Sequence, residues 1–491
     1  MSMRVAVVGA GIAGLSAARE LAVGGADVVL LEAGPRCGGK LDSVILDGVR
    51  LDCGAESVLA RRPEAVALMA DLGLGAQVVH PTSAKAQVYL GGEVRSLPPQ
   101  AMGVPVDLDS LEGFLSQQGL DRARQEPSLP APPLAGDVGI GAYVDARFGL
   151  EVTDRLLEPL LGGVYAGQAR ALSFEAVSPR LFELARAGGS LLEHARAMTP
   201  TQASGPVFAG LVGGIGRLVD VLLADLAVRG VQVRTGVTVR AVDRRRGGGF
   251  RLTTGPVPDP QALEVDAVVL ATPAAATSRL LGPFLPGVAA EVAAIPYASM
   301  AVVTLVVRHA SLAGSGLLVP PGQLPTIKAL THSSAKWQWV ADHASAAWGE
   351  DVSVVRASVG RLGEAELLQV DDATLLARTL AEARTLPGWD RAELVTSQVR
   401  RWGGALPQYL VGHRAVVARL RAAVAGVPGL EVCGAALDGL GIAATIGTAT
   451  GAARNILTAG GDTPSPERPN AECPESECPD SERQYDERNA R

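Results

Sequence analysis

The chain has 491 residues, of which 47% are hydrophobic and 19% are charged. At roughly 150 residues per domain, this length predicts about three folded units with a large buried core. Lysine and arginine number 44 against 51 aspartates and glutamates, so the formal net charge is −7. This balance gives no basic field that would draw the protein to nucleic acid, and we expect no nucleic-acid partner.

The cysteines and the first residues of the chain indicate the cellular compartment of the protein. Five cysteines, at 37, 53, 433, 473 and 478, are too few and too scattered for a disulfide framework. Residues 1–15 lead directly into a strand and a glycine-rich turn, without the pattern of a secretory signal. No apolar run approaches the about eighteen residues of a membrane-spanning helix. We therefore expect a cytoplasmic protein, which could still contact a membrane at its surface.

The first elements predict a βαβ unit. Residues 4–8 (RVAVV) and 27–31 (DVVLL) have the continuous apolar pattern of buried parallel strands, and residues 15–23 between them have helical composition. A glycine-rich turn joins the first strand to the helix. This pattern is typical of a doubly wound α/β fold.

The middle of the chain is mainly helical by pattern. In chain order we expect a helix at 63–72, a strand pair at 87–94 broken at two glycines, an exposed linker at 121–136 and helices up to residue 198, the first of them capped by Asp137.

Strands return in the second half. We expect a helix at 213–230, strands at 231–235 and 262–270, a second sheet containing 297–308 and 352–359, a strand or hairpin carrying Trp337 and Trp339, and a strand-turn-helix at 430–457. The segment from 461 to 491 contains nine acidic residues and four arginines and has no hydrophobic periodicity, which predicts a disordered acidic tail.

The glycine-rich turn matches the fingerprint GxGxxG. It reads Gly9-Ala10-Gly11-Ile12-Ala13-Gly14 and lies between a strand and a helix, where backbone N–H groups can receive a diphosphate. Glu32 ends the second strand, near the about 20-residue spacing at which a carboxylate accepts hydrogen bonds from a ribose. The pattern predicts a dinucleotide site, and at this point both NAD and FAD fit it.

The residues after Glu32 favour FAD. They read Ala33-Gly34-Pro35-Arg36-Cys37-Gly38-Gly39-Lys40, in which an arginine and a glycine pair can approach the diphosphate of an extended FAD. This segment resembles the flavoprotein superfamily of amine oxidases, carotenoid desaturases and porphyrinogen oxidases.

Four further segments are similar to the oxygen-dependent porphyrinogen oxidases within that superfamily. They are LDCGAES at 51–57, LEPLLGGVYAG at 157–167, the segment from Arg401 to His413, and the segment from Gly434 to Ile442. The second is the most specific to the family, and the resemblance extends from about residue 4 to 457.

The resemblance implies an FAD site whose residues come from the glycine-rich turn, from the segments 32–40, 51–57, 401–413 and 434–442, and from Val239 in the stretch GVTVRAV at 236–242. The expected cofactor contacts are Gly9, Ala10, Gly11, Ile12, Ala13, Gly14, Glu32, Ala33, Arg36, Gly39, Lys40, Gly54, Ala55, Glu56, Ser57, Val239, Trp402, Asp438, Leu440, Gly441 and Ile442. No catalytic side chain is expected, because the flavin carries the chemistry, and the six dispersed histidines show no metal-ligand spacing.

One departure concerns the substrate. Where some family members place an arginine for a propionate, this chain has Met102. Arg95, Gly163 and Val164 are the substrate contacts that we expect instead, and a solvated surface role for Arg95 remains open.

The predicted elements and the resemblance together imply three units. A Rossmann-like FAD-binding domain would combine residues 1–84, 206–290 and 415–460. Residues 85–205 would form a largely helical insertion, residues 291–414 a mixed-sheet α+β substrate domain, and residues 461–491 the tail.

The resemblance further implies that FAD and O₂ oxidise a porphyrinogen to a porphyrin with release of H₂O₂. Coproporphyrinogen III is the favoured substrate, with protoporphyrinogen IX as the alternative. An amine or carotenoid oxidase of the same superfamily and a non-catalytic binding protein of the same fold are also compatible with the sequence. Peripheral contact with a membrane and transient contact with a ferrochelatase are the partner hypotheses.

Overall fold

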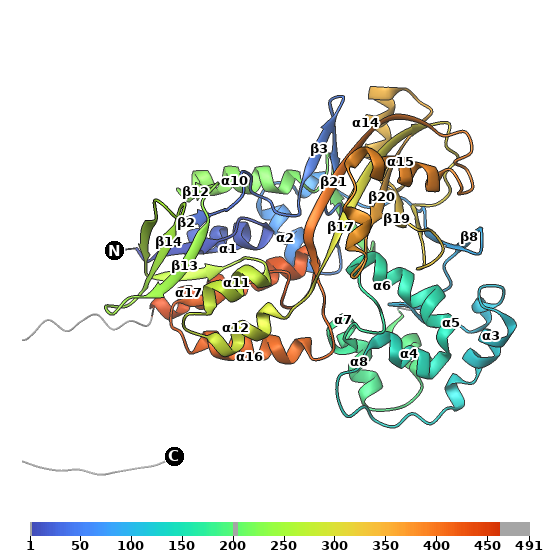
Figure 1. Ribbon diagram of the computed structural model, residues 1–491, viewed down its shortest axis with the longest axis horizontal. Coiled ribbons are helices and arrows are strands. Elements are labelled where there is room, and N and C mark those ends of the chain that lie inside the picture. Colours follow the sequence, from blue (N-terminus) through green and yellow to red (C-terminus); the bar gives the residue numbers. More distant parts are fainter. Residues whose placement is uncertain (1, 200–204, 462–491) are drawn as a thin grey trace, which may run out of the picture.

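The computed structural model describes residues 2–199 and 205–461. The predicted tail at 461–491 therefore lies almost entirely outside the described residues. Figure 1 shows a parallel sheet with its helices at one end of the molecule, and a large mixed sheet and a group of helices at the other. None of the described helices has the length and apolar character needed to cross a membrane.

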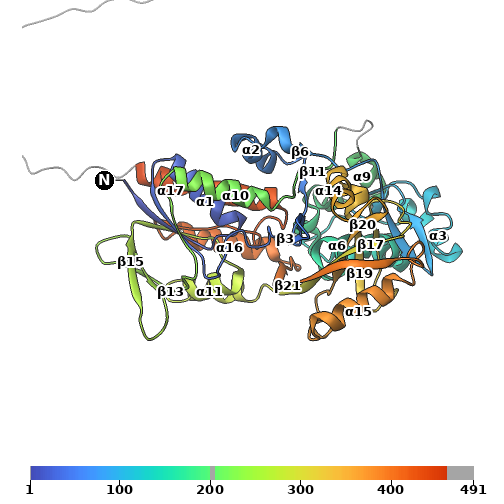
Figure 2. The same ribbon diagram turned by 90° about the horizontal axis from the view of Figure 1, so that it is seen from above.

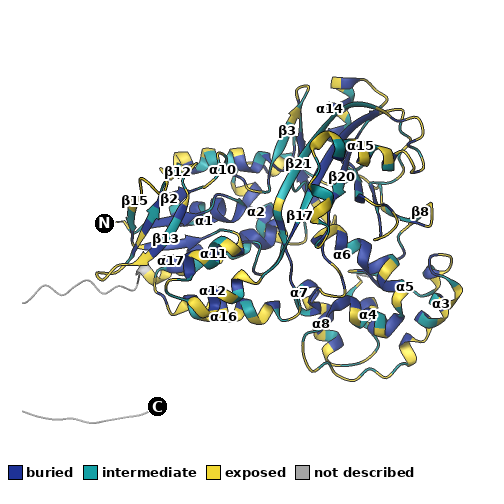
Figure 3. Cartoon of the chain, in the orientation of Figure 1, coloured by how far each residue is buried: buried dark blue, intermediate teal, exposed yellow. Residues whose placement is uncertain are grey.

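The first unit is built on a five-stranded parallel sheet in the order β12-β2-β1-β16-β22. Its strands are β1 (Arg4–Val8), β2 (Asp27–Leu31), β12 (Gln232–Arg234), β16 (Ala267–Leu270) and β22 (Leu430–Val432). The central strands are buried on both faces, which explains their continuous apolar sequences (Figure 3).

Different elements cover the two faces of this sheet. One face packs on α1 (Ile12–Val23), α10 (Arg217–Val228) and α17 (Ile442–Gly461), which lie side by side in Figure 2. The other face packs on the antiparallel strands β13 (Val239–Arg244), β14 (Phe250–Thr254) and β15 (Gln261–Val265) and on helices α11 (Ala274–Leu281), α12 (Pro286–Ala293) and α16 (His413–Ala425). Two core clusters therefore sandwich the sheet.

The second unit is a seven-stranded mixed sheet in the order β21-β17-β20-β19-β18-β7-β8. Its strands are β7 (Ala86–Leu90), β8 (Glu93–Ser96), β17 (Tyr297–Arg308), β18 (Gly316–Leu318), β19 (Ile327–His332), β20 (Val352–Val359) and β21 (Glu393–Pro407). All neighbours pair antiparallel except β18 and β7. One face packs on α15 (Asp372–Ala383), and part of the other packs on α14 (Gln338–Trp348) and the hairpin of β3 (Ser43–Leu46) and β4 (Val49–Asp52).

The third group is helical. It contains α3 (Gln117–Arg124), α4 (Ile140–Phe148), α5 (Leu150–Val152), a π-helical turn at Thr153–Leu157, α6 (Glu158–Tyr165), α7 (Phe174–Val177), α8 (Pro179–Arg186) and α9 (Leu191–Met198). A buried ion pair braces it: Arg147 Nε donates to Glu126 Oε1 at 2.8 Å, and the same carboxylate oxygen accepts from Leu191 N at the start of α9 at 2.7 Å.

Short elements link these units. The strands β5 (Val58–Leu59), β6 (Val78–Val79) and β11 (Phe208–Leu211) form a small antiparallel sheet, and β9 (Gln100–Ala101) pairs with β10 (Val104–Pro105). Helix α2 (Pro63–Asp71) packs near α17.

Five expectations need correction. Trp337 and Trp339 do not lie on a strand: they stand at the start of α14, so their spacing of two gave a misleading β-period. The segment 121–136 contains the end of α3 and a short 3₁₀ turn with the fully buried Glu126, so it is not an exposed linker throughout.

The other three concern caps and boundaries. Asp137 does not cap α4, which begins after Gly139; its carboxylate accepts from the N–H of Glu175 in α7 and of Gly412 instead. The apolar strand expected within 262–270 is β16, and residues 262–265 belong to a separate strand, β15. Strands β7 and β8 pair into the seven-stranded sheet, although the sequence grouped residues 85–96 with the helical insertion.

Candidate cofactor site

The expected cofactor residues gather at the carboxyl edge of the parallel sheet. Strand β1 leads into the turn at 9–14, β2 into Glu32, β16 into Ala271, and β22 into the segment 433–441 before α17. The backbone ties the first three together, because Gly9 N donates to Leu31 O at 2.7 Å and Ala271 N to Val8 O at 2.8 Å. This edge is where open α/β sheets bind their ligands.

Each glycine of the turn has a distinct role. A Cβ atom on Gly14 would lie 1.7 Å from the carbonyl oxygen of Gly9, and one on Gly9 would lie 2.8 Å from that of Ala271. A Cβ atom on Gly11, in contrast, would meet no atom within 4 Å. Gly9 and Gly14 therefore permit the tight packing of the turn, whereas Gly11 keeps open the space in front of the N-terminus of α1.

Glu32 closes one side of this space. Its carboxylate accepts hydrogen bonds from Ala10 N and Gly34 N, both at 2.8 Å. Its backbone oxygen accepts from Val237 N at 2.8 Å, just before Val239 begins β13. The carboxylate is thus fixed between the glycine turn and the next loop, with lone pairs left for ribose hydroxyls.

Arg36 and Trp402 belong to a cation cluster beside the turn. Arg36 lies 3.0 Å from the Asp42 carboxylate and donates to Gly39 O at 2.7 Å. Arg400 also pairs with Asp42, at 2.7 Å, and stacks over the Trp402 ring at 4.8 Å. Two arginines share one carboxylate, so this cluster carries an excess positive charge that suits a diphosphate.

Lys40 is the third cation at this edge. Its ammonium lies 6.0 Å from the centre of the Tyr297 ring, and burial lowers the pKa of Lys40 to about 8. The carbonyl of Lys40 presses against Gly54, where a Cβ atom would lie 2.0 Å from it. Gly54 is therefore a position at which only glycine lets the chain segments meet.

Glu56 does not extend freely toward the cofactor space. Its carboxylate pairs with Lys336 at 2.5 Å and Arg356 at 2.6 Å, and Arg356 also donates to the Gly54 carbonyl. Burial alone would raise the pKa of Glu56, but the two cations overcome this and lower it to about 2. Glu56 thus ties the segment 54–57, which includes Ala55 and Ser57, to the seven-stranded sheet.

Side chains of Tyr409 and His413 support the segment 434–442. The Tyr409 hydroxyl donates to Ala435 O at 2.5 Å, and His413, stacked on the Tyr409 ring at 4.1 Å, lies 3.0 Å through Nε2 from Leu437 O. Asp438 pairs with Arg421 on the exposed side of this loop. A Cβ atom on Gly441 would meet no atom within 4 Å, so Leu440, Gly441 and Ile442 present an open backbone at the start of α17.

The stretch 157–167 lies against the seven-stranded sheet. Gln408 donates to Tyr165 O at 2.7 Å and Leu362 N donates to Ala166 O at 2.7 Å. Gly163 faces Leu318 of β18, and Val164 is 58% exposed. This stretch forms the wall between the sheet and the helical group.

The structure places Arg95 on an edge strand of the seven-stranded sheet, away from the expected substrate contacts. It lies on the edge strand β8, pairs with Glu93 at 2.8 Å and donates to the Gly113 carbonyl. Its guanidinium is therefore already occupied at the outer edge of the sheet. Met102, 45% exposed, sits in a tight turn with φ of +52°.

Sequence reasoning assigned no role to Lys336, Arg356 or Lys328, and it included Gln408 only as part of the segment 401–413. The two lysines and Arg356 lie outside every motif, and their positions depend on the pairing of β17, β19, β20 and β21. The sequence offered one weak signal, because the chain contains only four lysines and two of them are Lys328 and Lys336.

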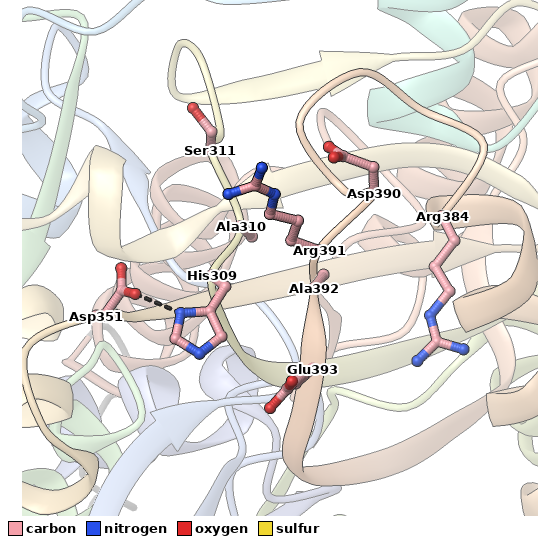
Figure 4. A pocket seen from close by; sticks show the side chains of 9 residues that line it. All are labelled: His309, Ala310, Ser311, Asp351, Arg384, Asp390, Arg391, Ala392 and Glu393. Carbon is pink, nitrogen blue, oxygen red and sulfur yellow. Dashed lines mark hydrogen bonds and ion pairs between the residues drawn. The ribbon is translucent and has the colours of Figure 1, made fainter.

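A separate charged pocket is open to solvent at the far end of β17 and β21 (Figure 4). In it, His309 Nδ1 lies 2.5 Å from the Asp351 carboxylate. Glu393 in this pocket pairs with Arg308, whereas Trp402 pairs with Met300, eight residues back along β17. At about 3.3 Å per residue the two places are roughly 26 Å apart, so this pocket is not part of the cofactor site. Within residues 2–199 and 205–461, no cluster of metal-ligating side chains occurs.

The open edge fits FAD. The Cβ positions of Gly11 and Gly441 are empty, helices α1 and α17 begin there, the Glu32 carboxylate is fixed beside the turn, and Lys40 and Arg36 supply positive charge. Helix N-termini offer backbone N–H groups to an anion such as a diphosphate. These observations define the class of protein, an FAD-dependent oxidoreductase.

The comparisons with known proteins agree. The model of the flavin containing amine oxidoreductase family matches residues 12–457. A coproporphyrinogen III oxidase from Mycobacterium tuberculosis is 36% identical over 92% of this chain and 97% of its own length, and one from Bacillus subtilis is 29% identical over 92% and 98%. The chain belongs to the flavin containing amine oxidoreductase family, in its porphyrinogen oxidase branch.

Solved structures support the same assignment. A protein from Exiguobacterium sp. 255-15 named for protoporphyrinogen oxidase superposes with a TM-score of 0.80 at 30% identity, covering 93% of this chain and 99% of the other. A putrescine oxidase superposes with a TM-score of 0.65 at 17% identity, covering 93% and 99%, and shows the likeness of the fold alone.

Proposed function

We propose that the protein oxidises coproporphyrinogen III to coproporphyrin III, using FAD and O₂ and releasing H₂O₂. The observation that carries the proposal is an intact cofactor edge in a chain that matches named coproporphyrinogen III oxidases over 92% of its length. A non-catalytic binding protein would not need Gly11, Glu32 and Lys40 in this arrangement.

The reaction removes six electrons and six hydrogens in three two-electron steps, and three O₂ become three H₂O₂. FAD, when bound, supplies the hydride chemistry. The chain's own residues hold and orient the cofactor and the substrate. We propose that the turn at 9–14 and the start of α17 bind the diphosphate, that Glu32 binds the ribose, and that the segment 54–57 lies along the flavin.

The seven-stranded sheet supplies the substrate side. Paired residues on β17, β20 and β19 place Val302, Ser358 and Ala329 on the same face as Arg356, which reaches the segment 54–57. Small and apolar side chains there leave a surface against which a flat macrocycle can pack and from which water is excluded. No acid–base pair is required of this face.

The alternative substrate is protoporphyrinogen IX. A protoporphyrinogen oxidase from Bos taurus is 29% identical over 68% of this chain, a shorter and weaker match than that to the mycobacterial relative.

The test is a single-cuvette experiment. The purified protein should show flavin absorbance that bleaches on anaerobic addition of coproporphyrinogen III and returns with air as porphyrin absorbance grows. The same experiment with protoporphyrinogen IX supplies the comparison. Faster turnover of protoporphyrinogen IX would reverse the substrate assignment. Bound flavin that reacts with neither porphyrinogen would contradict the proposal.

We also propose a cytoplasmic location and transient transfer of the product to a ferrochelatase. Cell fractionation tests the first. Mild crosslinking followed by affinity purification tests the second, and absence of the ferrochelatase from the crosslinked material would count against it.

A further inference from the structure

Lys328 is a buried lysine whose amine has no partner in the described part of the chain. It lies on β19, where the pairing with β20 shifts register between Ile327 and Ala329. The residue is 2% exposed, and its ammonium has no hydrogen-bond partner among the described residues. Burial, with the nearby Arg361, lowers the pKa of Lys328 to about 7. Because an unpaired buried charge costs stability, packing does not account for a lysine here.

Arg361 brings a second cation to the same place. It is 9% exposed, and its guanidinium donates to Val319 O at 2.8 Å, while Val319 N donates to Lys328 O at 3.0 Å. Two carboxylates lie near this pair. Glu364 is 3.6 Å from Arg361, with its second oxygen unpaired, and Glu158 accepts a hydrogen bond from Ala169 N at 2.7 Å.

These carboxylates do not saturate the two cations. Burial raises the pKa of Glu158, which favours its neutral form. Glu364 touches Arg361 alone among the ion pairs of the described residues. Lys328 and Arg361 together therefore have room for one more anion.

Helix α6 passes close to Arg361 at a residue without a side chain. At Gly162 a Cβ atom would lie 3.9 Å from Glu158 Oε1 and 4.0 Å from Arg361 Nε, and at Gly163 it would lie 3.3 Å from Leu318. The family-specific stretch at 157–167 thus meets Arg361 at Gly162 and β18 at Gly163.

The cations also lie within reach of the cofactor edge. Thr331 pairs with Arg356, whose guanidinium holds the Gly54 carbonyl, and Ala329, next to Lys328, pairs with Ser358. Lys328 precedes Thr331 by three residues, which is about 10 Å along a strand. A macrocycle lying on this face beside the segment 54–57 could therefore extend a side chain to Lys328.

We propose that Lys328 and Arg361 form a subsite that binds a carboxylate of the porphyrinogen side chains. The inference rests on the proposed function. Lys328 and Arg361 replace Arg95 as the candidates for this role. The guanidinium of Arg95 already binds Glu93 and the Gly113 carbonyl. A carboxylate would give the ammonium its missing partner and could accept from the guanidinium as well.

The test compares Lys328→Met with Lys85→Met, which alters an exposed lysine. Steady-state oxidation of coproporphyrinogen III and titration of the oxidised holoenzyme with coproporphyrin III give KM, kcat and the product Kd. Loss of a charge-assisted hydrogen bond should raise KM and Kd about tenfold or more in Lys328→Met, with kcat and flavin content unchanged. The melting temperature should not fall, because an unpaired buried charge is removed.

Glu364→Gln separates the proposal from a structural role. If Lys328 serves a carboxylate of the substrate, loss of the competing Glu364 charge should leave KM unchanged or lower it. If Lys328 instead serves Glu364, both variants should lose thermal stability with an unchanged KM, and that result would overturn the proposal.

The wild-type protein separates this proposal from the proposed function. A wild type that oxidises coproporphyrinogen III, together with a Lys328→Met variant of equal KM, contradicts only the subsite. A wild type that retains flavin but oxidises no porphyrinogen contradicts the function itself.

Discussion

At the scale of single residues, the glycines of the turn at 9–14 make two different demands on the chain. Gly14 is required by the fold, since a Cβ atom would overlap the Gly9 carbonyl, whereas Gly11 borders open space. Glycine is therefore needed for packing of the backbone at position 14, whereas at position 11 we expect it to leave room for the ligand.

This difference gives the first prediction. Gly11→Ala should fold with a nearly unchanged melting temperature as apoprotein but lose most of its flavin, because its methyl group enters the space in front of α1. Gly14→Ala should fold poorly or not at all, because the backbone must move by more than an ångström. Circular dichroism and the flavin-to-protein absorbance ratio measure the two effects. Full flavin occupancy in Gly11→Ala would mean that the diphosphate lies elsewhere.

Glu32→Ala is the second prediction. The carboxylate anchors two backbone N–H groups at 2.8 Å and is placed for the ribose, so its removal should weaken FAD retention about tenfold or more. Dialysis against flavin-free buffer, followed by fluorescence of the released flavin, measures this. Glu20→Ala, which removes a carboxylate paired with Arg454 at the surface, is the control and should keep its flavin. Equal retention in both variants would show that the ribose contact is misplaced.

At the scale of elements, the sequence predicted what local patterns encode. The strands β1 and β2 were expected because a buried parallel strand is apolar throughout, and α2 and α17 were expected from helical periodicity. The start of α14 was misjudged, because two tryptophans two residues apart fit a strand as well as a helix end. Nothing local indicated the π-helical turn at Thr153–Leu157, which introduces α6 and its buried Pro159.

Some residues of the candidate site could be predicted from a local pattern and others could not. Glu32 and the glycines follow a contiguous motif, so the sequence could place them. Lys328 and Arg356 depend on a register shift and on the pairing of strands that lie far apart in the sequence, which no local pattern encodes.

The loop before α17 gives the third prediction. Tyr409 holds this loop through one hydrogen bond to Ala435 O. Tyr409→Phe should therefore cost about 1 kcal/mol of stability and loosen flavin binding a few-fold, while the ring keeps its packing on His413. Tyr143→Phe, in the helical group, is the matched control. Thermal unfolding and flavin release rates would show the difference, and equal flavin release from both variants would contradict the bracing role.

At the scale of the whole molecule, the ion cluster of Glu56, Lys336 and Arg356 joins two units. Glu56 belongs to the segment beside the cofactor edge, whereas Arg356 comes from the seven-stranded sheet and Lys336 from the short helix α13 (Ser333–Lys336) before α14. The segment 54–57 is thus held in place by residues of the other unit.

This cluster gives the fourth prediction. The pKa of Glu56 is lowered to about 2 in the folded state from an ordinary value of 4.5. Its contribution to stability is therefore fully present above about pH 4.5 and is lost as the pH falls toward 2. Glu56→Gln should lower the stability by about 3 kcal/mol at neutral pH and flatten the fall in stability between pH 5 and 2.

Thermal melts across that pH range measure both effects. Glu93→Gln, which alters an exposed pair, is the control and should follow the wild-type profile. A Glu56→Gln variant with the wild-type profile would show that the cluster contributes no net stability.

The order of the strands in the parallel sheet also determines when the cofactor edge is completed during synthesis of the chain. Strand β22 and the opening of α17 complete the cofactor edge, yet they begin at Leu430, after most of the chain has left the ribosome. Strands β1 and β2 emerge first and must wait for them. We therefore expect the flavin to load late in biosynthesis, so that nascent chains stalled before residue 430 should emerge without the nucleotide.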